Sequence, residues 1–436
     1  MAIISHSVSA SYDSFIHKRF HSWRYRIFGV MWLLYAGYYL CRKNYAVAQP
    51  VIMKEFGWDG QDVGIIITSY LTMYAVGQFL SGPFGDRFGA RKIIIIGLSL
   101  SIIANLLFSS ATSIHLMTVL MGMNGLAQAT GWSNSMKTMS NWFSIDERGR
   151  TMAWWATNYQ VGELVSTAFA AFIISFATWR EAFWIPALGL GVVGVVFLWG
   201  QRNRPEDVGL PSLTDYVNTE TDVEKKDTES GIEEEYSLKR ILKEVLWNKY
   251  IWNLGFSYFF IKLVRYTFLF WLSTYLVQVM GFLPASAGYV SAIFPLTGFL
   301  GTVAAGYSSD KFFSARRGPV NVIMLSLLVI AIYGYSLFAG HLILGPLFLG
   351  LIGFSTFGPD TLISATAAMD FGSRKASSTA AGFINGFGSI GAALSGVLVA
   401  WISVELGWGA VFYFLMMVTA ASLILQIFMW NARGAN

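Results

Sequence analysis

The chain has 436 residues, of which 55% are hydrophobic and 13% are charged, about half the charged fraction of an ordinary globular protein. Its 34 Phe, 20 Tyr and 16 Trp residues give more apolar surface than a soluble protein can cover, and they exclude a disordered chain. The net charge is +5, but the basic residues lie in short clusters between apolar runs, which favours a membrane protein over a nucleic-acid-binding one.

Residues 1–23 lack the basic segment followed by an apolar core that marks a cleavable signal peptide, so we expect a cytosolic tail. Beyond it, twelve stretches are apolar over about 20 residues, the length of a membrane-spanning helix. Their continuous apolar runs predict helices, because barrel strands alternate instead. The stretches are 26–47, 61–84, 91–111, 114–135, 152–176, 180–200, 250–279, 285–308, 319–339, 342–366, 376–400 and 407–430.

One long polar connection divides the chain. Residues 202–245 hold 12 of the 25 acidic residues and have few large apolar side chains, so they cannot bury a core. We assign residues 202–247 to a cytosolic linker, with an amphipathic helix near residues 236–245. The linker separates a six-helix N-terminal half, residues 24–201, from a six-helix C-terminal half, residues 248–436.

The distribution of basic residues predicts the orientation. With the N-terminus inside, only Lys54 and Arg180 fall in external loops, whereas 24 of the 30 Lys and Arg residues fall on the cytosolic side. Both termini are therefore expected in the cytosol.

The two halves carry a repeated loop. GPFGDRFGARK at 82–92 follows the second predicted helix, and GYSSDKFFSARRG at 306–318 follows the eighth, 224 residues later. Two six-helix halves with the same orientation predict the all-α major facilitator fold, with twelve transmembrane helices in two pseudo-symmetric halves. We expect the charged residues of these loops to hold gates between helices. They are Asp86, Arg87, Arg91 and Asp310.

A few ionisable residues interrupt the apolar stretches. Such a residue is costly in a membrane and needs a partner or an aqueous cavity. Arg42 precedes Gly82 by 40 residues and Arg265 precedes Gly306 by 41, so the repeat places the two arginines at equivalent points. Facing each other across a central cavity, they would repel unless an anion lay between them, and the planar guanidinium suits phosphate. The alternative is that they form ion pairs with Glu163 and Asp360.

The remaining intramembrane residues allow more than one role. Lys262 lies one helical turn from Arg265, so it is either a third cation of the site or a partner of Asp360 or Glu163. Asp360 follows Gly358 and Pro359, a break that would open the backbone toward a cavity. Either acid would couple protons to transport or neutralise a cation. Four tyrosines are candidates to line a polar cavity: Tyr38, Tyr39, Tyr159 and Tyr266.

Other chemistries lack their motifs. The sequence has no GxxxxGK[ST] nucleotide loop, which argues against ATP-driven transport, and no nucleophilic elbow. Its single cysteine, Cys41, and five histidines in tails or loops form no metal-binding cluster. We therefore expect no enzyme activity, no metal and no cofactor.

Several segments resemble the organophosphate:phosphate antiporter family of the major facilitator superfamily. The resemblance extends over about residues 25–430, and its most telling segments occur in the family's order. The segments are YYLCRKNYAVAQP at 38–50, NGLAQATGW at 124–132, NWFSIDERG at 141–149, RPEDVGLP at 204–211, RYTFLFWLSTYL at 265–276 and FGPDTLI at 357–363. The resemblance implies that Arg42 and Arg265 bind the phosphate moiety.

The chain also departs from the family pattern. Gln78 stands where many relatives have lysine, Tyr159 where glycerol-phosphate carriers have histidine, and Phe270 where an acid is usual. The position of Asp360 is often apolar or an amide. We expect Arg42 and Arg265 to grip phosphate with help from Lys262, and Tyr159, Gln78 and Asp360 to contact the organic portion of the substrate.

The resemblance implies a secondary transporter that exchanges a sugar phosphate or glycerol phosphate for inorganic phosphate by alternating access. It also implies a bacterial inner membrane, a monomer and the lipid bilayer as partner. Two alternatives stay open. One is a membrane receptor with a transporter fold that senses a sugar phosphate. The other is a proton-coupled importer of another organic anion, with Asp360 or Glu163 titrating.

Overall fold

The computed structural model of the protein describes residues 2–144, 147, 151–152, 154–155, 157–213, 215–216, 246–314, 316–367 and 377–432. Within these ranges the regular structure is entirely helical. The N-terminal half contains α1 (Ala2–Tyr38), η1 (Tyr39–Cys41), α2 (Lys43–Phe56), α3 (Gly60–Phe88), α4 (Ala90–Ser110), α5 (Ile114–Gln128), α6 (Thr130–Trp142), α8 (Thr157–Phe176) and α9 (Glu181–Gly200).

A short connection, η2 (Pro205–Val208), follows the N-terminal half. The C-terminal half contains α12 (Lys249–Gln278), α13 (Pro284–Ser291), α14 (Ile293–Phe312), α15 (Arg317–Phe338), α16 (Leu344–Thr361), the π-helical segment η3 (Leu362–Ala367), α18 (Ser377–Glu405) and α19 (Gly407–Phe428).

These elements make the twelve predicted helical spans, some of which are interrupted. Among the described residues, ten are long and apolar enough to cross a membrane. The first span, α1–η1–α2, is broken at residues 39–42, whereas the fourth and eighth spans each contain a single-residue turn with helical backbone angles, at Ala129 and Ala292. The sequence predicted the first span as a continuous helix, so its break is a correction.

The polar ends of the N-terminal half are also more ordered than their composition indicates. Helix α1 begins at Ala2, so the predicted tail is continuous with the first span. The Tyr216 ring, in the predicted linker, stacks on Phe20 of α1 with centroids 4.0 Å apart, and Leu210 is buried. The start of the linker thus packs on α1. The amphipathic helix predicted near residues 236–245 lies outside the described residues.

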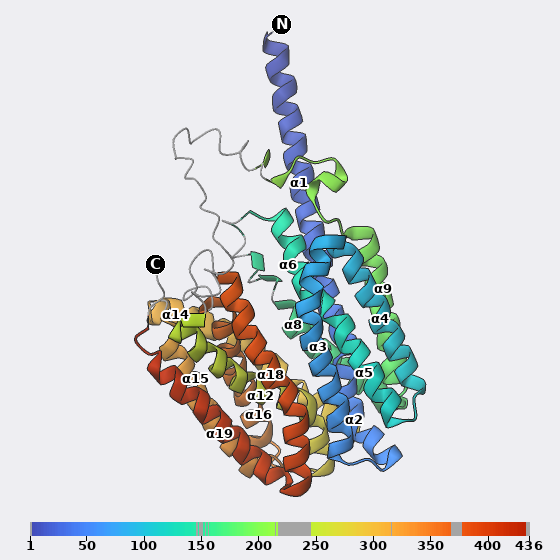
Figure 1. Ribbon diagram of the computed structural model, residues 1–436, viewed down its shortest axis with the longest axis vertical. Helices are drawn as coiled ribbons and strands as arrows, with labels where there is room; N and C mark the ends of the chain where they lie inside the picture. The colour runs from blue at the N-terminus through green and yellow to red at the C-terminus, as the bar shows by residue number, and fades with distance from the viewer. Residues whose placement is uncertain are drawn as a thin grey trace.

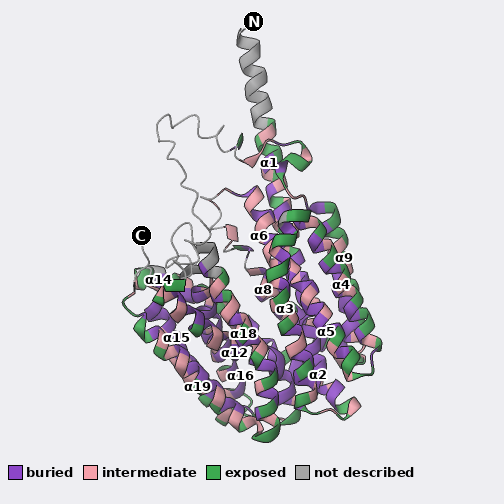
Figure 2. Ribbon diagram, viewed as in Figure 1, coloured by how far each residue is buried: buried purple, intermediate pink, exposed green. Residues whose placement is uncertain are grey.

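The two halves lie side by side, and both chain ends lie at the same end of the bundle (Figure 1), here called the terminal end. The opposite end is called the distal end. Buried residues gather between the helices, and exposed ones cover the outer faces (Figure 2). Large apolar side chains are prominent on these faces, as with Phe79, Val195 and Ile330, which are 72%, 66% and 61% exposed.

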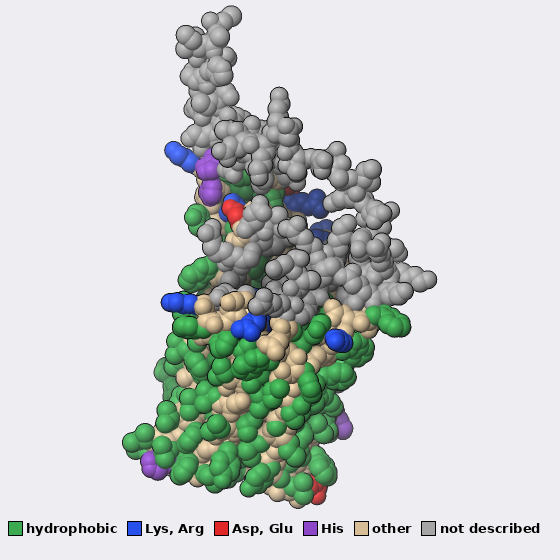
Figure 3. Space-filling view, turned by 90° about the vertical axis from the view of Figure 1, so that its left-hand side faces the viewer, with side chains coloured by type: hydrophobic (Ala, Val, Ile, Leu, Met, Phe, Trp, Pro, Cys, Tyr) green, Lys and Arg blue, Asp and Glu red, His purple; other side chains and the backbone are tan. Residues whose placement is uncertain are grey.

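An apolar belt surrounds the bundle. On the face shown in Figure 3, hydrophobic side chains cover the part toward the distal end, and Lys and Arg side chains lie along the border of this area toward the terminal end. Water would not tolerate so large an apolar surface, but lipid chains would cover it. The protein is therefore an integral, multi-pass membrane protein.

The halves are pressed together at the distal end. A Cβ atom on Gly64 of α3 would lie 2.5 Å from the Ala400 Cβ atom of α18, and one on Gly288 of α13 would lie 2.6 Å from the Ala171 Cβ atom of α8. The Gln61 amide donates to Glu405 across the same junction at 3.2 Å. Small residues thus let the halves meet closely on the side away from the termini.

Glycine also permits close packing within the C-terminal half, which gives a first prediction. A Cβ atom on Gly301 of α14 would lie 2.0 Å from the Phe354 carbonyl oxygen of α16, whereas one on Gly306 of the same helix would meet nothing within 4 Å. We expect Gly301→Ala to lower the free energy of unfolding by about 1–3 kcal/mol, because the backbones must move apart.

Thermal unfolding of the detergent-solubilised protein checks this prediction, with Gly306→Ala as the matched control. The control should unfold at or slightly above the wild-type temperature, because alanine favours the helix. Equal melting temperatures for the two variants would contradict the close approach of α14 and α16.

Candidate substrate site between the two halves

The break in the first span places Arg42 at the site. Residues 39–41 form a single 3₁₀ turn, and Arg42 itself has φ −119° and ψ −47° between that turn and α2. The break leaves the Cys41 carbonyl oxygen outside a regular helix, and it accepts hydrogen bonds from Asn124 Nδ2 (2.7 Å) and Gln128 Nε2 (3.1 Å). Side chains of α5 therefore satisfy the broken backbone in the membrane interior.

The Arg42 guanidinium is buried without an acid beside it. Its Nε atom donates to Gln128 Oε1 at 2.9 Å, and its charge lies over the rings of Tyr39 (4.5 Å), Tyr74 (5.0 Å) and Tyr70 (6.0 Å). Arg42 is only 4% exposed, and none of the ion pairs among the described residues includes it. Ring faces stabilise the cation only partly. The site thus carries a buried positive charge that lacks a counterion in this part of the chain.

Arg265, on α12, has a different environment. Its Nη1 atom donates to Asp360 Oδ2 at 2.8 Å, and its Nη2 atom lies 3.5 Å from Glu163 Oε2. The guanidinium also lies over the rings of Phe357 (4.3 Å) and Tyr159 (5.3 Å). Arg265 therefore forms the ion pairs that were the alternative expectation from the sequence. The two pseudo-equivalent arginines thus differ in their ion pairs, since Arg42 has none among the described residues.

Lys43 extends the charged network across the two halves. Its Nζ atom donates to the Leu269 carbonyl oxygen of α12 at 2.8 Å and lies 3.7 Å from Glu163 Oε1. Glu163, on α8, is completely buried and so lies between Lys43 of its own half and Arg265 of the other. A buried carboxylate shared by two cations resists the loss of either one.

Lys262 supplies a fourth cation. Its ammonium lies over the rings of Tyr258 (5.1 Å) and Tyr266 (5.2 Å), and it interacts electrostatically with Asp360. It is half-buried and forms no hydrogen bond or ion pair with another residue in the described ranges. Lys262 is thus the most accessible cation of the site.

The backbone around Asp360 is irregular. Pro359 has no N–H to donate, and the Leu362 N–H is shared between the Gly358 and Pro359 carbonyl oxygens before the π-helical segment η3 begins. Such wide turns often occur at functional sites. The Gly-Pro pair predicted a break here, but α16 continues through Pro359 to Thr361 and passes directly into η3.

Four buried polar atoms of the site have no hydrogen-bond partner in the described part of the chain. Two are donors, Arg42 Nη2 and Arg265 Nε, and two are acceptors, Asp360 Oδ1 and Glu163 Oε1. Buried polar groups are nearly always satisfied, so several unsatisfied groups in one place point to a polar or charged guest. Tyr39 interacts electrostatically with both arginines, so both guanidinium groups lie near it.

The other predicted contacts fall around this centre. The Tyr159 hydroxyl lies 3.4 Å from Thr361 Oγ1, and Gln160 Nε2 donates to Thr302 Oγ1 at 2.6 Å, both across the halves. Gln78 is half-buried, one helical turn from Tyr74 on α3. Tyr38 is completely buried inside the N-terminal half, its hydroxyl 3.3 Å from Thr130 Oγ1, and it is Tyr39 whose ring covers Arg42.

Sequence reasoning missed four residues that surround the cations: Tyr70, Tyr74, Gln128 and Tyr258. A signal existed for the first two, because Tyr70, Tyr74 and Gln78 recur every four residues in an apolar helix and so share one face. Gln128 and Tyr258 carried no comparable pattern.

The predicted gating residues are only partly described. Arg91 bonds within its own half, its guanidinium to the Leu198 carbonyl oxygen and its backbone N–H to Asn203 Oδ1 at 3.0 Å. Arg87 is exposed, 5.3 Å from the Phe88 ring. The side chains of Asp86 and Asp310 lie outside the description, so the gating role stays a prediction.

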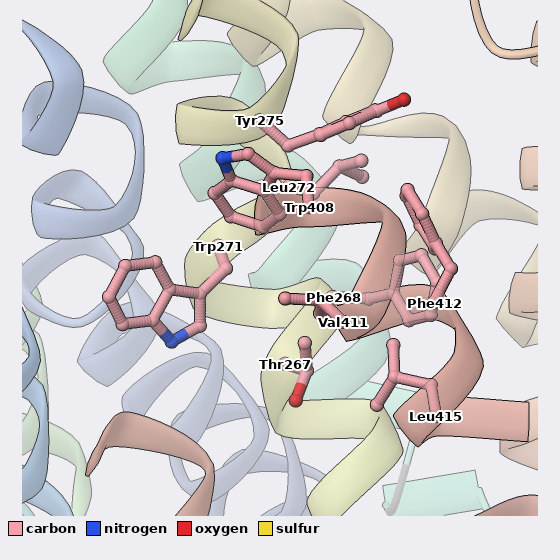
Figure 4. Close-up of a pocket in the computed structure, with 9 residues that line it drawn as sticks. All are labelled: Thr267, Phe268, Trp271, Leu272, Tyr275, Trp408, Val411, Phe412 and Leu415. Atoms are coloured by element: carbon pink, nitrogen blue, oxygen red, sulfur yellow. The ribbon is translucent and has the colours of Figure 1, made fainter. Parts of the chain in front are cut away.

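A small cavity lies elsewhere, between α12 and α19 (Figure 4). Its lining is almost wholly apolar and includes Trp271, Tyr275, Trp408 and Phe412, with Thr267 at its edge. The Thr267 hydroxyl donates to the Leu263 carbonyl oxygen at 2.8 Å. No charged side chain lines this cavity, so it offers nothing to an anion and is distinct from the arginine site.

Comparison with known proteins decides the family. The family model of the Major Facilitator Superfamily matches residues 31–396. A probable hexose phosphate transport protein of Chlamydia trachomatis is 31% identical, over 98% of this chain and 95% of that protein. The glycerol-3-phosphate transporter of Bacillus subtilis is 31% identical, over 96% and 95% of the two chains. The chain belongs to the organophosphate:phosphate antiporter family of this superfamily.

The family contains a sensor as well as transporters. The membrane sensor protein UhpC of Escherichia coli is 32% identical to this chain, over 96% of this chain and 94% of the sensor. The match confirms the predicted family, which comprises transport proteins and not enzymes.

Solved structures confirm the fold. A bacterial homologue of the human lysosomal transporter Spinster, in an inward-facing and unoccupied conformation, has a TM-score of 0.74 over 94% of this chain and 95% of its own, at 14% identity. A D-xylose–proton symporter has a TM-score of 0.72 over 93% and 97%, also at 14% identity. The protein thus has the predicted major facilitator fold.

Proposed function

We propose that the protein exchanges a phosphorylated metabolite, a sugar phosphate or glycerol phosphate, for inorganic phosphate by alternating access. The observation that carries the proposal is the buried Arg42 guanidinium, which has a free Nη2 atom and no acid partner among the described residues. The printed names of the hexose phosphate and glycerol-3-phosphate transport proteins support the substrate class.

The proposed roles follow the geometry. Arg42 binds the phosphate moiety from the N-terminal half and Arg265 binds it from the C-terminal half, with Lys262 assisting. The organic portion contacts the polar side chains around them. These are Tyr159, Gln78, Asp360 and Tyr266; Tyr38, whose hydroxyl lies 3.3 Å from Thr130 Oγ1 inside the N-terminal half, is not among them. The gates are formed by Asp86, Arg87, Arg91 and Asp310.

Charge explains why such a carrier exchanges anions. Closing the empty site removes water from Arg42 and leaves its charge without a counterion, which is unfavourable in a low-dielectric interior. A bound phosphate bridges the cations of the two halves and lowers this cost. Each switch between the two open states then requires an anion, so transport in one direction is matched by transport in the other.

The orientation rests on the positive-inside rule. The Lys and Arg side chains at the terminal end support a cytosolic location for both termini. We place the protein in a bacterial inner membrane as a monomer.

The test is uptake of radiolabelled phosphate into liposomes that contain the purified protein. The liposomes are preloaded with phosphate, with glycerol 3-phosphate, with glucose 6-phosphate or with buffer alone. We expect uptake only into loaded vesicles, and the preferred internal anion identifies the organic substrate. Rapid uptake into empty vesicles would overturn obligatory exchange.

A second candidate, a sugar-phosphate receptor, is favoured by the similarity to the sensor protein. Binding of a sugar phosphate without flux, by protein that remains folded in the same liposomes, would support the receptor. Uptake that follows an imposed pH gradient and is lost in Asp360→Asn would instead support a proton-coupled importer, for which the buried carboxylates of Asp360 and Glu163 provide titratable groups.

A further inference from the structure

The two arginines proposed to bind phosphate are not equally available. Arg42 Nη2 has no hydrogen-bond partner among the described residues, and its Nε atom donates to the neutral Gln128. Arg265 already shares both Nη atoms with carboxylates, Asp360 at 2.8 Å and Glu163 at 3.5 Å, and only its Nε atom is free. An anion that binds Arg265 must therefore compete with an acid of the protein.

Asp360 is the stronger competitor. It makes the shorter contact with Arg265, and its carboxylate is 3% exposed, so water screens it little. Glu163 makes the longer contact and also lies 3.7 Å from Lys43, which keeps its charge balanced if Arg265 turns away. Asp360 has no such second ion pair among the described residues.

Lys262 offers Asp360 an alternative partner. The groups that interact electrostatically with Asp360 include Arg265, Lys262, Tyr159 and Tyr258. Of these only Arg265 and Lys262 are cations, and Lys262 is held over two tyrosine rings without an acid at ion-pair distance. Asp360 lies in the last turn of α16, directly before the π-helical segment η3.

We propose that Asp360 is a specificity-determining residue, an internal competitor for Arg265 that selects doubly charged phosphate groups. This inference rests on the proposed function. A singly charged anion brings no more charge to Arg265 than the carboxylate it displaces. A phosphate monoester, which carries close to two negative charges at neutral pH, outcompetes the carboxylate, and Asp360 then pairs with Lys262.

The experiment measures binding of radiolabelled inorganic phosphate to the full-length protein in lipid nanodiscs. Methyl phosphate and dimethyl phosphate compete for the site, because they differ by one methyl group and by about one unit of charge. The variants are Asp360→Asn and the matched control Asp360→Glu, which keeps the charge. Thermal unfolding verifies that each variant is folded.

We expect the wild type to prefer methyl phosphate strongly. Asp360→Asn should bind inorganic phosphate more tightly and should narrow the preference by about tenfold, because dimethyl phosphate no longer competes with a carboxylate. Asp360→Glu should retain the preference. Lys262→Gln should weaken phosphate binding in both backgrounds, and more in the wild type than in Asp360→Asn, because only the wild type also loses the alternative partner of Asp360.

Phosphate binding by the wild type would support the site itself. Even then, three outcomes would overturn the inference about Asp360. The first is weaker phosphate binding in Asp360→Asn, which would make Asp360 a support of Arg265. The second is an unchanged preference between the two competitors. The third is uptake of a proton upon phosphate binding, detected by calorimetry in buffers of different ionisation enthalpy and absent from Asp360→Asn. Failure of the wild type to bind phosphate would overturn the proposed function as well.

Discussion

Replacement of Arg42 by lysine is expected to abolish phosphate exchange and to leave the stability of the protein nearly unchanged. Lysine keeps the charge but lacks the planar pair of donors that binds phosphate oxygens at two points. The guanidinium forms no ion pair within the described residues, so its removal leaves no buried acid without a partner. We expect the exchange rate to fall at least 100-fold, on the scale of lost charge-assisted hydrogen bonds.

The measurement is phosphate exchange in phosphate-loaded liposomes, with thermal unfolding of the same preparations. Gln128→Glu is an informative companion, because it places a carboxylate beside Arg42, where Gln128 Oε1 now accepts from Nε at 2.9 Å. That internal acid should inhibit exchange by occupying the guanidinium, and the variant also loses the Nε2 donor to the Cys41 carbonyl oxygen. Exchange at the wild-type rate by Arg42→Lys would show that phosphate exchange does not depend on the guanidinium of this residue.

The positions of the two arginines could be predicted from the internal repeat, but their environments could not. A loop repeated after the second and eighth spans fixes equivalent points along the first and seventh spans. The partners of the arginines come from other spans, Gln128 from α5, Glu163 from α8 and Asp360 from α16. Which face each of those helices turns to the centre depends on packing between spans, and apolar runs in a membrane protein carry little periodicity that would reveal it.

The break in the first span shows a second limit. Residues 39–42 contain neither glycine nor proline, so nothing local indicates that the helix is interrupted. The break is stable because Asn124 and Gln128, more than 80 residues later, bond to the Cys41 carbonyl oxygen. By contrast, Gly358 and Pro359 predicted a break near Asp360, yet Pro359 lies inside α16, which continues to Thr361.

In the linker, the polar composition gave no indication of a contact that the structure contains. Its acidic residues predict that residues 202–245 have no core of their own, and most of this segment lies outside the described residues. Two apolar side chains at its start, Leu210 and Tyr216, nevertheless pack against the core of the N-terminal half. The helix extension that receives them, around Phe20, belongs to a segment predicted as a tail, so neither partner indicated the contact alone.

Replacement of Arg265 by alanine is expected to damage stability as well as transport, in contrast to Arg42. The substitution leaves Asp360 without its 2.8 Å partner and removes one of the two cations beside Glu163, and both acids are buried. Loss of one partner from a buried ion pair typically costs about 3–5 kcal/mol, because the remaining charge cannot be solvated. We expect low yields, early thermal unfolding and no exchange.

A second substitution separates the two effects. Arg265→Ala combined with Asp360→Asn removes the orphaned acid together with its partner, so thermal stability should recover most of the loss, while exchange stays absent because the phosphate has lost its ligand from the C-terminal half. The matched pair of Arg42→Ala and Arg42→Ala with Asp360→Asn should show no such recovery, since Asp360 contacts Arg265 and not Arg42. If the first pair also failed to recover, the cost of losing Arg265 would lie in packing against Phe357 and Tyr159 rather than in charge. The comparison thus tests whether the arginines at equivalent points of the repeat differ in role. Arg42 would be available to the anion, whereas Arg265 would pair with the protein's own acids until an anion binds.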